Sequence, residues 1–350
     1  MLELHSQLGT PARPRYEHEL RQSSNLTRLA APLLPLLSER ATLDVVVNAD
    51  ESVWVNRLGS GFERVGDFCV HDSTLLLQGI ATIRHIAFDH DHPILETIFP
   101  ITGDRIEGLI SPVIDGAVLA IRTRQKQIFT LSEMTDAGIL SNKADPLNAK
   151  LHHDDFLQRT QGRDHLGIIR LAAQYRRNIL LVGPTGSGKT TFANSIIAEW
   201  ADVTPSDRVV IIEDTPELQC SLANHVQLLA TAHVSQTDLL VASLRLIPKR
   251  IVVGEVREPE PAQVLLGAWN TGHSGGLATI HANDALSGLR KLETLIGGHE
   301  ASVRERIASA INVVIFIDGE ESIPAGRKVR EVLVVRDYNR TTQDYAIEYV

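Results

Sequence analysis

Apolar and polar positions follow a regular order along the C-terminal two thirds of the chain. Short apolar runs, typical of buried strands, alternate with longer stretches in which apolar residues recur every three or four positions, as in helices. The pattern predicts helices at 164–176, 188–200, 236–246, 259–270 and 284–296, and strands at 178–182, 208–213, 250–254, 276–281, 312–318 and 329–335, before an alternating segment at 343–350. Strands that alternate with helices predict an α/β fold, with a parallel sheet covered on both faces.

The first 124 residues carry a different pattern. A helical apolar stripe at 26–37 is interrupted by Pro32 and Pro35, so we expect a broken helix there. Strands are predicted at 42–48, 52–56, 105–113 and 117–122, and a helix at 74–88. This grouping predicts a smaller α+β domain.

Polar segments divide the chain into parts. Residues 1–22 are polar and contain proline, so we expect them to be poorly ordered. Residues 125–150 contain a short helix starting at Ser132 and then the polar run SNKADPLN, which is typical of a connector. We therefore predict an N-terminal α+β domain at 1–124, a linker at 125–150 and an α/β domain at 151–350.

Composition narrows the class of protein. With 350 residues the chain is long enough for two cores, and its 43% hydrophobic and 22% charged residues are ordinary for a soluble protein. A net charge of -9 argues against a broad nucleic-acid-binding surface, so we expect no stable nucleic-acid binding. Cys69 and Cys220 lie too far apart in sequence to form a metal-ligand pair, which fits a reducing compartment.

The hydrophobic runs are short. None approaches the length of about 18 residues that a membrane-spanning helix needs. The N-terminus has no apolar signal core. We expect a cytoplasmic protein, and peripheral docking on a membrane complex stays open because docking needs no membrane span.

One segment matches a phosphate-binding motif throughout. The stretch GPTGSGKTT follows a predicted strand, precedes a predicted helix and matches the P-loop pattern G-x-x-x-x-G-K-[ST]. Its glycines allow backbone N–H groups to surround a phosphate, and the helix N-terminus adds its positive dipole end. The predicted nucleotide-binding residues are Gly183, Pro184, Thr185, Gly186, Ser187, Gly188, Lys189, Thr190 and Thr191. We expect Lys189 to reach the outer phosphates of a nucleoside triphosphate and the Thr190 hydroxyl to hold Mg²⁺.

An acidic residue follows the apolar run 250–254. Glu255 comes at the carboxyl end of a parallel strand, where ligands of such sheets bind. We expect its carboxylate to polarise the attacking water. Gly254 stands where P-loop enzymes usually carry a metal-binding aspartate, so metal contact falls to Thr190 with waters and neighbouring acids. The alternative for Glu255 is an exposed acid at a strand end.

A second strand ends in two acids. Glu213 ends the run 208–213 and Asp214 follows it, and the same sheet edge would bring them near the P-loop. The alternative for Asp214 is a turn cap before Pro216.

Two histidines flank the strand predicted at 276–281. His273 and His281 are accompanied by glycines, and a hydrogen bond from either to the γ-phosphate could sense the nucleotide. The alternative is that each is an ordinary packed or surface histidine.

The order of these motifs resembles that of the ATPases of type II and type IV secretion systems. The segments IPKRIVVGEVREPE and HSGG…HAND are similar to those of the conjugal-transfer, TrbB-type branch, and GDRIEGLISPV, AIRTRQ and FTLSEM resemble the family's N-terminal strands and linker. The resemblance implies a homohexameric ring whose subunits pair a sensory N-terminal domain with a RecA-like P-loop ATPase domain. It also implies ATP and Mg²⁺, a cytoplasmic location at the inner membrane, and secretion or conjugation channel proteins as partners.

The resemblance assigns roles to individual residues. It implies catalytic roles for Glu255, Glu213, Arg105, Arg122, His273 and His281, and metal binding by Thr190 and Asp214. Arg105 and Arg122 match N-terminal arginines that reach the phosphates, whereas some relatives carry another basic residue at the position of Arg124. Without the resemblance, an arginine at a strand end is usually a solvated charge.

Three classes of function compete. The first is a motor that hydrolyses ATP and closes the cleft between its domains to drive secretion or conjugal transfer. The second is a RecA-like motor that moves along nucleic acid. The negative net charge of the chain disfavours this class. The third is a scaffold that binds nucleotide without hydrolysing it, left open by the missing aspartate. Two distant cysteines rule out the four-cysteine zinc insert of pilus-extension relatives, whereas a pilus-retraction motor is harder to exclude.

Overall fold

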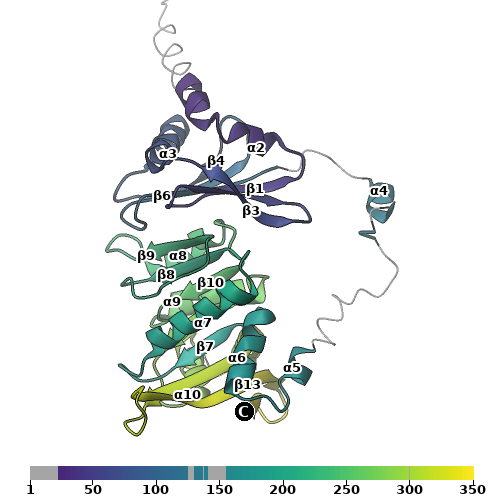
Figure 1. Cartoon of the computed structure of the whole chain (residues 1–350), viewed down its shortest axis with the longest axis vertical. Helices are drawn as coiled ribbons and strands as arrows, with labels where there is room; N and C mark the ends of the chain where they lie inside the picture. Colours follow the sequence, from purple (N-terminus) through teal and green to yellow (C-terminus); the bar gives the residue numbers. More distant parts are fainter. Residues whose placement is uncertain (1–22, 125–129, 137, 141–154, 299) are drawn as a thin grey trace, which may run out of the picture. The chain divides into compact units, whose positions relative to one another are not determined.

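The chain forms two compact units, each with its own sheet. The computed structural model describes residues 23–124, 130–136, 138–140, 155–298 and 300–350, so the expected N-terminal tail and most of the expected linker lie outside the described residues. One unit comprises Met1–Arg124 and is called the N-terminal unit; the other, Gln125–Val350, is called the C-terminal unit. Figure 1 shows the six-stranded sheet of the first unit and the eight-stranded sheet of the second.

The N-terminal unit is an antiparallel sheet with helices on one face. Its strand order is β3-β2-β1-β6-β5-β4. The strands are β1 (Thr42–Val47), β2 (Ser52–Arg57), β3 (Gly61–Asp67), β4 (Ile94–Ile98), β5 (Arg105–Ile110) and β6 (Ala117–Arg122), and the helices are α2 (Leu34–Ser38) and α3 (Val70–Arg84). Leu76, Leu77 and Ile80 of α3 are buried in the core with Ile106 and Leu119 of the sheet.

The predicted interruption of the first helix is present. Residues 23–30 are helical, residues 31–33 form a turn, and α2 begins with Pro35 in its first turn. Proline is tolerated at that position because the first N–H groups of a helix have no partner inside the helix.

The C-terminal unit contains an eight-stranded mixed sheet. Its strand order is β14-β13-β12-β7-β11-β10-β8-β9, in which the run from β12 to β9 is parallel and the last two strands along the chain are antiparallel. The strands are β7 (Ile179–Val182), β8 (Val209–Glu213), β9 (His225–Leu229), β10 (Arg250–Val253), β11 (Leu277–Ile280), β12 (Val313–Gly319), β13 (Arg327–Asn339) and β14 (Asp344–Tyr349).

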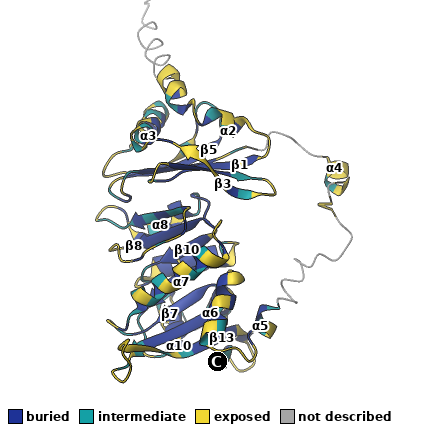
Figure 2. Ribbon diagram, in the orientation of Figure 1, coloured by how far each residue is buried: buried dark blue, intermediate teal, exposed yellow. Residues whose placement is uncertain are grey.

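Helices cover both faces of this sheet. They are α5 (Phe156–Arg159), α6 (His165–Gln174), α7 (Lys189–Val203), α8 (Gln236–Ser243), α9 (Pro259–Asn270), α10 (Ala285–Leu295) and α11 (Ala301–Ala310), and a short α4 (Leu131–Asp136) precedes them. On one face Ile168 of α6 and Trp200 of α7 join the core with Leu181 of β7. On the other, Gly288 of α10 lies against Val182. Figure 2 shows the strands buried between the helices, so the predicted α/β architecture is confirmed.

Parallel pairing gives the sheet two distinct edges. The carboxyl ends of β7, β8, β10 and β11 lie along one edge, because all four strands run in the same direction. Residues that follow these strands therefore meet at that edge, as expected for the ligand side of such a sheet. Within the described residues no helix is both long and apolar enough to span a bilayer.

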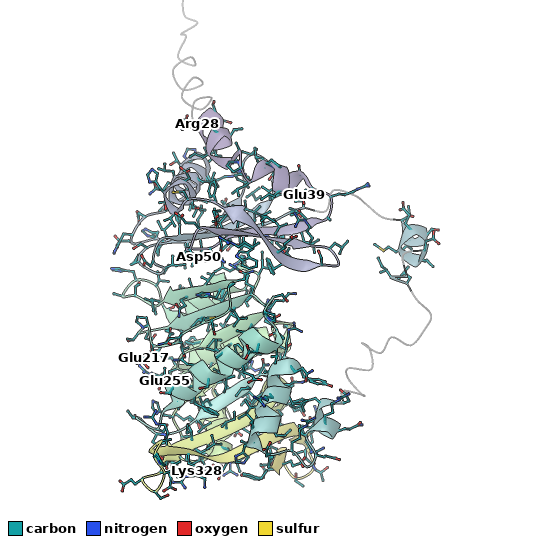
Figure 3. All side chains as sticks on the ribbon, viewed as in Figure 1. Arg28, Glu39, Asp50, Glu217, Glu255 and Lys328 are labelled. Atoms are coloured by element: carbon teal, nitrogen blue, oxygen red, sulfur yellow. The ribbon has the colours of Figure 1, made fainter. Side chains whose placement is uncertain are left out.

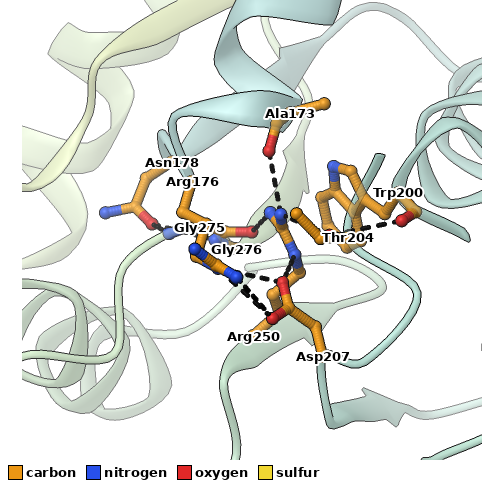
Figure 4. A network of polar contacts seen from close by, with 9 residues as sticks. All are labelled: Ala173, Arg176, Asn178, Trp200, Thr204, Asp207, Arg250, Gly275 and Gly276. Atoms are coloured by element: carbon orange, nitrogen blue, oxygen red, sulfur yellow. Dashed lines mark hydrogen bonds and ion pairs between the residues drawn. The ribbon is translucent and has the colours of Figure 1, made fainter. Parts of the chain in front are cut away.

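The opposite edge is held by a buried ionic network (Figure 4). Asp207, just before β8, accepts from Arg250 Nε through Oδ2 at 2.8 Å and from Arg176 Nη2 through Oδ1 at 2.8 Å. Arg250 is fully buried and also donates to the carbonyls of Gly275 and Ala173, each at 2.8 Å. Burial lowers the pKa of Arg250 to about 10, although Asp207 acts in the opposite direction. The network thus joins the amino ends of β8 and β10 to the segment before β11.

Asn178 extends these contacts to β7. Its Oδ1 accepts from the backbone N–H groups of Gly275 at 2.7 Å and Gly276 at 2.9 Å. Its Nδ2 donates to the carbonyl of Ala310 at 2.6 Å. The segment that leads into β11 is therefore fixed from several neighbouring strands.

Candidate active site

The P-loop connects β7 to α7. Gly186 and Gly188 have φ values of +76° and +93°, a left-handed backbone that glycine adopts without strain. Gly188 is the N-cap of α7 and no side chain caps the helix. The first N–H groups of α7 are thus left to a ligand, and a phosphate oxygen is the acceptor that suits them.

A pocket of 540 Å³ opens beside this loop. Its size lies in the range typical of small-molecule sites, about 300–1,000 Å³. Its lining combines the loop with acids and cations from other strands: Thr185, Gly186, Gly188, Lys189, Thr190, Thr191, Glu213, Asp214, Glu217, Glu255, Arg257, His281 and Arg327. Figure 3 labels two of the acids, Glu217 and Glu255, on the same side of the C-terminal unit.

Lys189 is held inside the pocket. Its Nζ donates to the carbonyls of Gly183 and Pro184, each at 2.9 Å, and lies 3.2 Å from His281 Nδ1. Burial lowers the pKa of Lys189, with Glu255 acting in the opposite direction. These partners are neutral, so the ammonium group can pair with an anionic phosphate.

Glu255 is fixed by two neighbours. Its Oε1 lies 2.8 Å from His281 Nε2, and its Oε2 accepts from Arg257 Nη2 at 2.7 Å. An ammonium group can only donate, so His281 Nδ1 accepts from Lys189 and the proton of the neutral ring lies on Nε2, facing Glu255. The three residues form a continuous chain of contacts from the phosphate-binding lysine to the carboxylate.

The charge state of Glu255 follows from these contacts. Burial alone raises its pKa, but the hydrogen bond from Arg257 and the positive charges of Arg257 and Lys189 hold the pKa below its usual value. Glu255 is therefore ionised at neutral pH, the state in which a carboxylate can accept a hydrogen bond from water.

Glu213 has a different environment. It is 3% exposed, and its Oε1 accepts from the backbone N–H groups of Glu217 at 3.0 Å and Leu218 at 2.9 Å. Burial raises its pKa against these hydrogen bonds. Glu213 lines the pocket, and these contacts hold the turn that follows β8.

Thr190 and Asp214, the predicted metal-binding residues, contact different side chains. Thr190 Oγ1 donates to Glu217 Oε2 at 3.0 Å, whereas Asp214 lies 3.7 Å from Arg257. No cluster of three or more His, Cys, Asp or Glu side chains suited to a metal occurs in the described part of the chain. Magnesium often takes one or two protein ligands and keeps several waters, so Thr190 with a nearby carboxylate fits it.

The two predicted histidines are separated. His281 follows β11 and lines the pocket, whereas His273 precedes β11 and hydrogen-bonds through its backbone N–H to Ala268 at the opposite edge of the sheet. The structure brings only His281 of these two histidines into this pocket, because the length of β11 separates them.

Arg105 and Arg122 lie in the N-terminal unit. They begin β5 and end β6, and they face each other in the strand register. Arg122 Nε donates to Asp44 Oδ1 at 2.8 Å. The fold therefore brings the two cations together at one end of this sheet.

Sequence reasoning gave no role to three pocket residues. Arg257 lies two positions after Glu255, and this spacing puts both side chains on one side of an extended segment. The spacing could therefore have indicated that Arg257 contacts Glu255. Glu217 lies four positions after Glu213, close enough in sequence to be found. Arg327 is 136 positions from its partner Thr191, and no local signal links them.

Comparisons with known proteins indicate the family of the chain. Residues 158–318 match the family described as "Type II/IV secretion system protein". The chain is 35% identical over 339 residues to the conjugal transfer protein TrbB of Rhizobium radiobacter, covering 95% of each chain. It is 31% identical over 318 residues to the type IV secretion system protein PtlH of Bordetella pertussis, covering 86% of this chain and 92% of the relative.

A solved structure has the same fold. The VirB11 ATPase from the Brucella suis type IV secretion system, determined in complex with sulphate, superposes with a TM-score of 0.79 at 24% identity, over 90% of this chain and 96% of that one. At this level of identity the likeness concerns the fold.

Proposed function

The chain belongs to the type II/IV secretion system protein family, in its conjugal-transfer branch, and we propose that it hydrolyses ATP to power a type IV secretion or conjugal-transfer apparatus. Relatives matched along most of its length are named for these systems. One observation carries the proposal: the P-loop lysine and an ionised glutamate lie in one pocket, joined through His281.

Phosphoryl transfer to water needs positioning and charge compensation more than covalent chemistry by the protein. Lys189 and the N-terminus of α7 would hold the phosphates. Glu255, kept ionised by its neighbours, would accept a hydrogen bond from the attacking water and orient it. Mg²⁺, held by Thr190 with Glu217 or Asp214 and waters, would neutralise charge on the outer phosphates.

The proposal extends to the assembly. It includes a homohexamer that works in the cytoplasm, docked at the inner membrane on channel proteins. We also propose that Arg105 and Arg122 contact the phosphates once ATP is bound. Nucleotide binding would then close the N-terminal domain onto the ATPase domain. The relatives named for conjugal transfer and type IV secretion support the partnership with such an apparatus. The homohexamer and the arginine contact are what the resemblance to this family implies.

Lys189→Ala tests the proposed activity. Loss of the ammonium group removes charge-assisted contacts to the phosphates, so phosphate release should fall at least about 100-fold. Lys328→Ala removes an exposed lysine at the start of β13 and should leave the rate unchanged. A Lys189→Ala protein that turns over ATP at the wild-type rate would refute the assignment of residues 183–191 as a nucleotide-binding loop.

The same assay tests the role proposed for Arg122. Arg122→Ala should slow ATP hydrolysis while nucleotide binding persists.

A further inference from the structure

Arg327 reaches the P-loop from an unexpected direction. It is the first residue of β13 and pairs with Gly319 at the end of β12. In the sheet β12 lies on one side of β7, the strand that leads into the P-loop, while β11 and β10 lie on the other. Figure 1 labels β13 and β10 on opposite sides of β7. His281 and Glu255 follow those two strands, so Arg327 approaches the loop from the opposite flank.

Arg327 fills space that a glycine leaves. Its Nη1 donates to Thr191 Oγ1 at 3.2 Å. A Cβ built on Gly188 would lie 2.4 Å from Nη1 and 2.9 Å from Cζ. Any side chain at position 188 would therefore displace the guanidinium group, which lies directly against the phosphate-binding loop.

The charge of Arg327 is not neutralised by a carboxylate. The other arginine of this hairpin near the turn, Arg330, pairs with Glu320 at 2.9 Å and donates to the carbonyl of Gly319. Across the residues that the structure describes, Arg327 forms no ion pair, and its hydrogen bond goes to a neutral hydroxyl. An arginine is permanently charged, and its planar group matches phosphate oxygens with two parallel donors.

The side of β7 from which Arg327 approaches indicates which part of a nucleotide it would contact. In P-loop sites the backbone N–H groups surround the inner phosphates, and the lysine reaches the outer ones. Lys189 Nζ lies 3.2 Å from His281, so the outer phosphates belong on the side of β11 and β10. The innermost phosphate and the nucleoside then lie toward β12 and β13. We propose that Arg327 binds the innermost phosphate of the nucleotide, an inference that rests on the proposed function.

Binding calorimetry with two ligands tests this role. ADP and a non-hydrolysable ATP analogue share the innermost phosphate, so Arg327→Ala should weaken both by the same factor, about tenfold to a hundredfold. Arg327→Lys should recover part of the loss because it keeps the charge but not the paired donors. Lys328→Ala, one position along β13, is the matched control and should bind both ligands like the wild type. Unchanged thermal unfolding of Arg327→Ala would show that its fold is intact.

The outcomes separate this inference from the proposed function. If Arg327→Ala binds both ligands like the wild type while Lys189→Ala loses affinity, the role of Arg327 is refuted and the proposed function stands. A loss confined to the triphosphate analogue would place Arg327 at the outer phosphate and overturn the inner-phosphate assignment. If the wild type binds neither ligand, both the proposed function and this inference fail.

Discussion

The side chain of Arg257 controls the carboxylate on which the proposed hydrolysis depends. It donates to Glu255 at 2.7 Å and lies 3.7 Å from Asp214. That hydrogen bond also raises the pKa of Arg257 itself. Arg257 is therefore expected to act as a positioning residue that fixes the orientation and the charge of Glu255.

Arg257→Ala should shift the pH dependence of ATP hydrolysis. The arginine helps to hold the pKa of Glu255 below its usual value, so its removal should raise that pKa. Because the ionised form is the active one, the acid limb of the rate profile should move to higher pH, and the deficit relative to the wild type should grow as the pH falls. Rates measured from about pH 5 to about pH 8 would check this. A profile that falls uniformly with an unshifted acid limb would contradict the assigned effect on ionisation.

Local sequence predicted several residues that the structure places together in the pocket. The spacing of Gly183 to Lys189 indicates a phosphate loop by itself, and Glu255 was found because it follows an apolar strand. The separation of His273 from His281 was not foreseen, because proximity in sequence says little about which edge of a sheet a residue occupies. Arg327 was missed because its place depends on the pairing of β12 with β7, which no short segment reveals.

At the scale of elements, the Asp207 network holds the amino ends of several strands together. Asp207→Asn would remove the charge that faces two arginines, one of them fully buried. Breaking a buried pair from one side costs about 3–5 kcal/mol, so the free energy of unfolding should fall by about that amount. Denaturant unfolding at neutral pH would measure it. Asp155→Asn, which breaks an exposed pair with Arg159 on α5, should cost no more than about 1 kcal/mol.

The same network predicts a dependence of stability on pH. Burial raises the pKa of Asp207, but the hydrogen bond from Arg176 and the charge of Arg250 hold it below its usual value. The contribution of a carboxylate whose folded pKa is depressed is complete above its unfolded pKa, about 3.9, and is lost as the pH falls through the folded value. The stability difference between wild type and Asp207→Asn should thus be constant near neutrality and shrink below about pH 4. An unchanged difference in acid would contradict this assignment.

Elements that are buried on both faces were the most predictable. The strand at 178–182 and the helix that follows it were expected within a few residues of where they lie, because a continuous apolar run and a Gly-rich turn define them. The strand β3 was not expected, since it is largely exposed and has no alternating apolar pattern. The helix α11, with the polar sequence ASVRERIASA, was missed for a similar reason.

At the scale of the whole molecule, the proposed ring makes a direct prediction of mass. Light scattering in the presence of a non-hydrolysable ATP analogue should give six times the subunit mass of 38.5 kDa. If nucleotide binding is coupled to assembly, Lys189→Ala should lose the effect of the analogue, since only a ligand bound preferentially to the assembled form can favour assembly. A mass of one subunit with and without the analogue would contradict the ring.

In the proposed reaction ATP binds at the P-loop and is hydrolysed by a water molecule that Glu255 orients. The most direct test is phosphate release by Glu255→Gln, in samples whose ATP affinity has been measured. The substitution keeps the shape of the side chain and removes the acceptor charge, so affinity should stay close to that of the wild type while phosphate release falls at least about 100-fold. Release at the wild-type rate, or loss of ATP binding by the variant, would contradict the role assigned to Glu255.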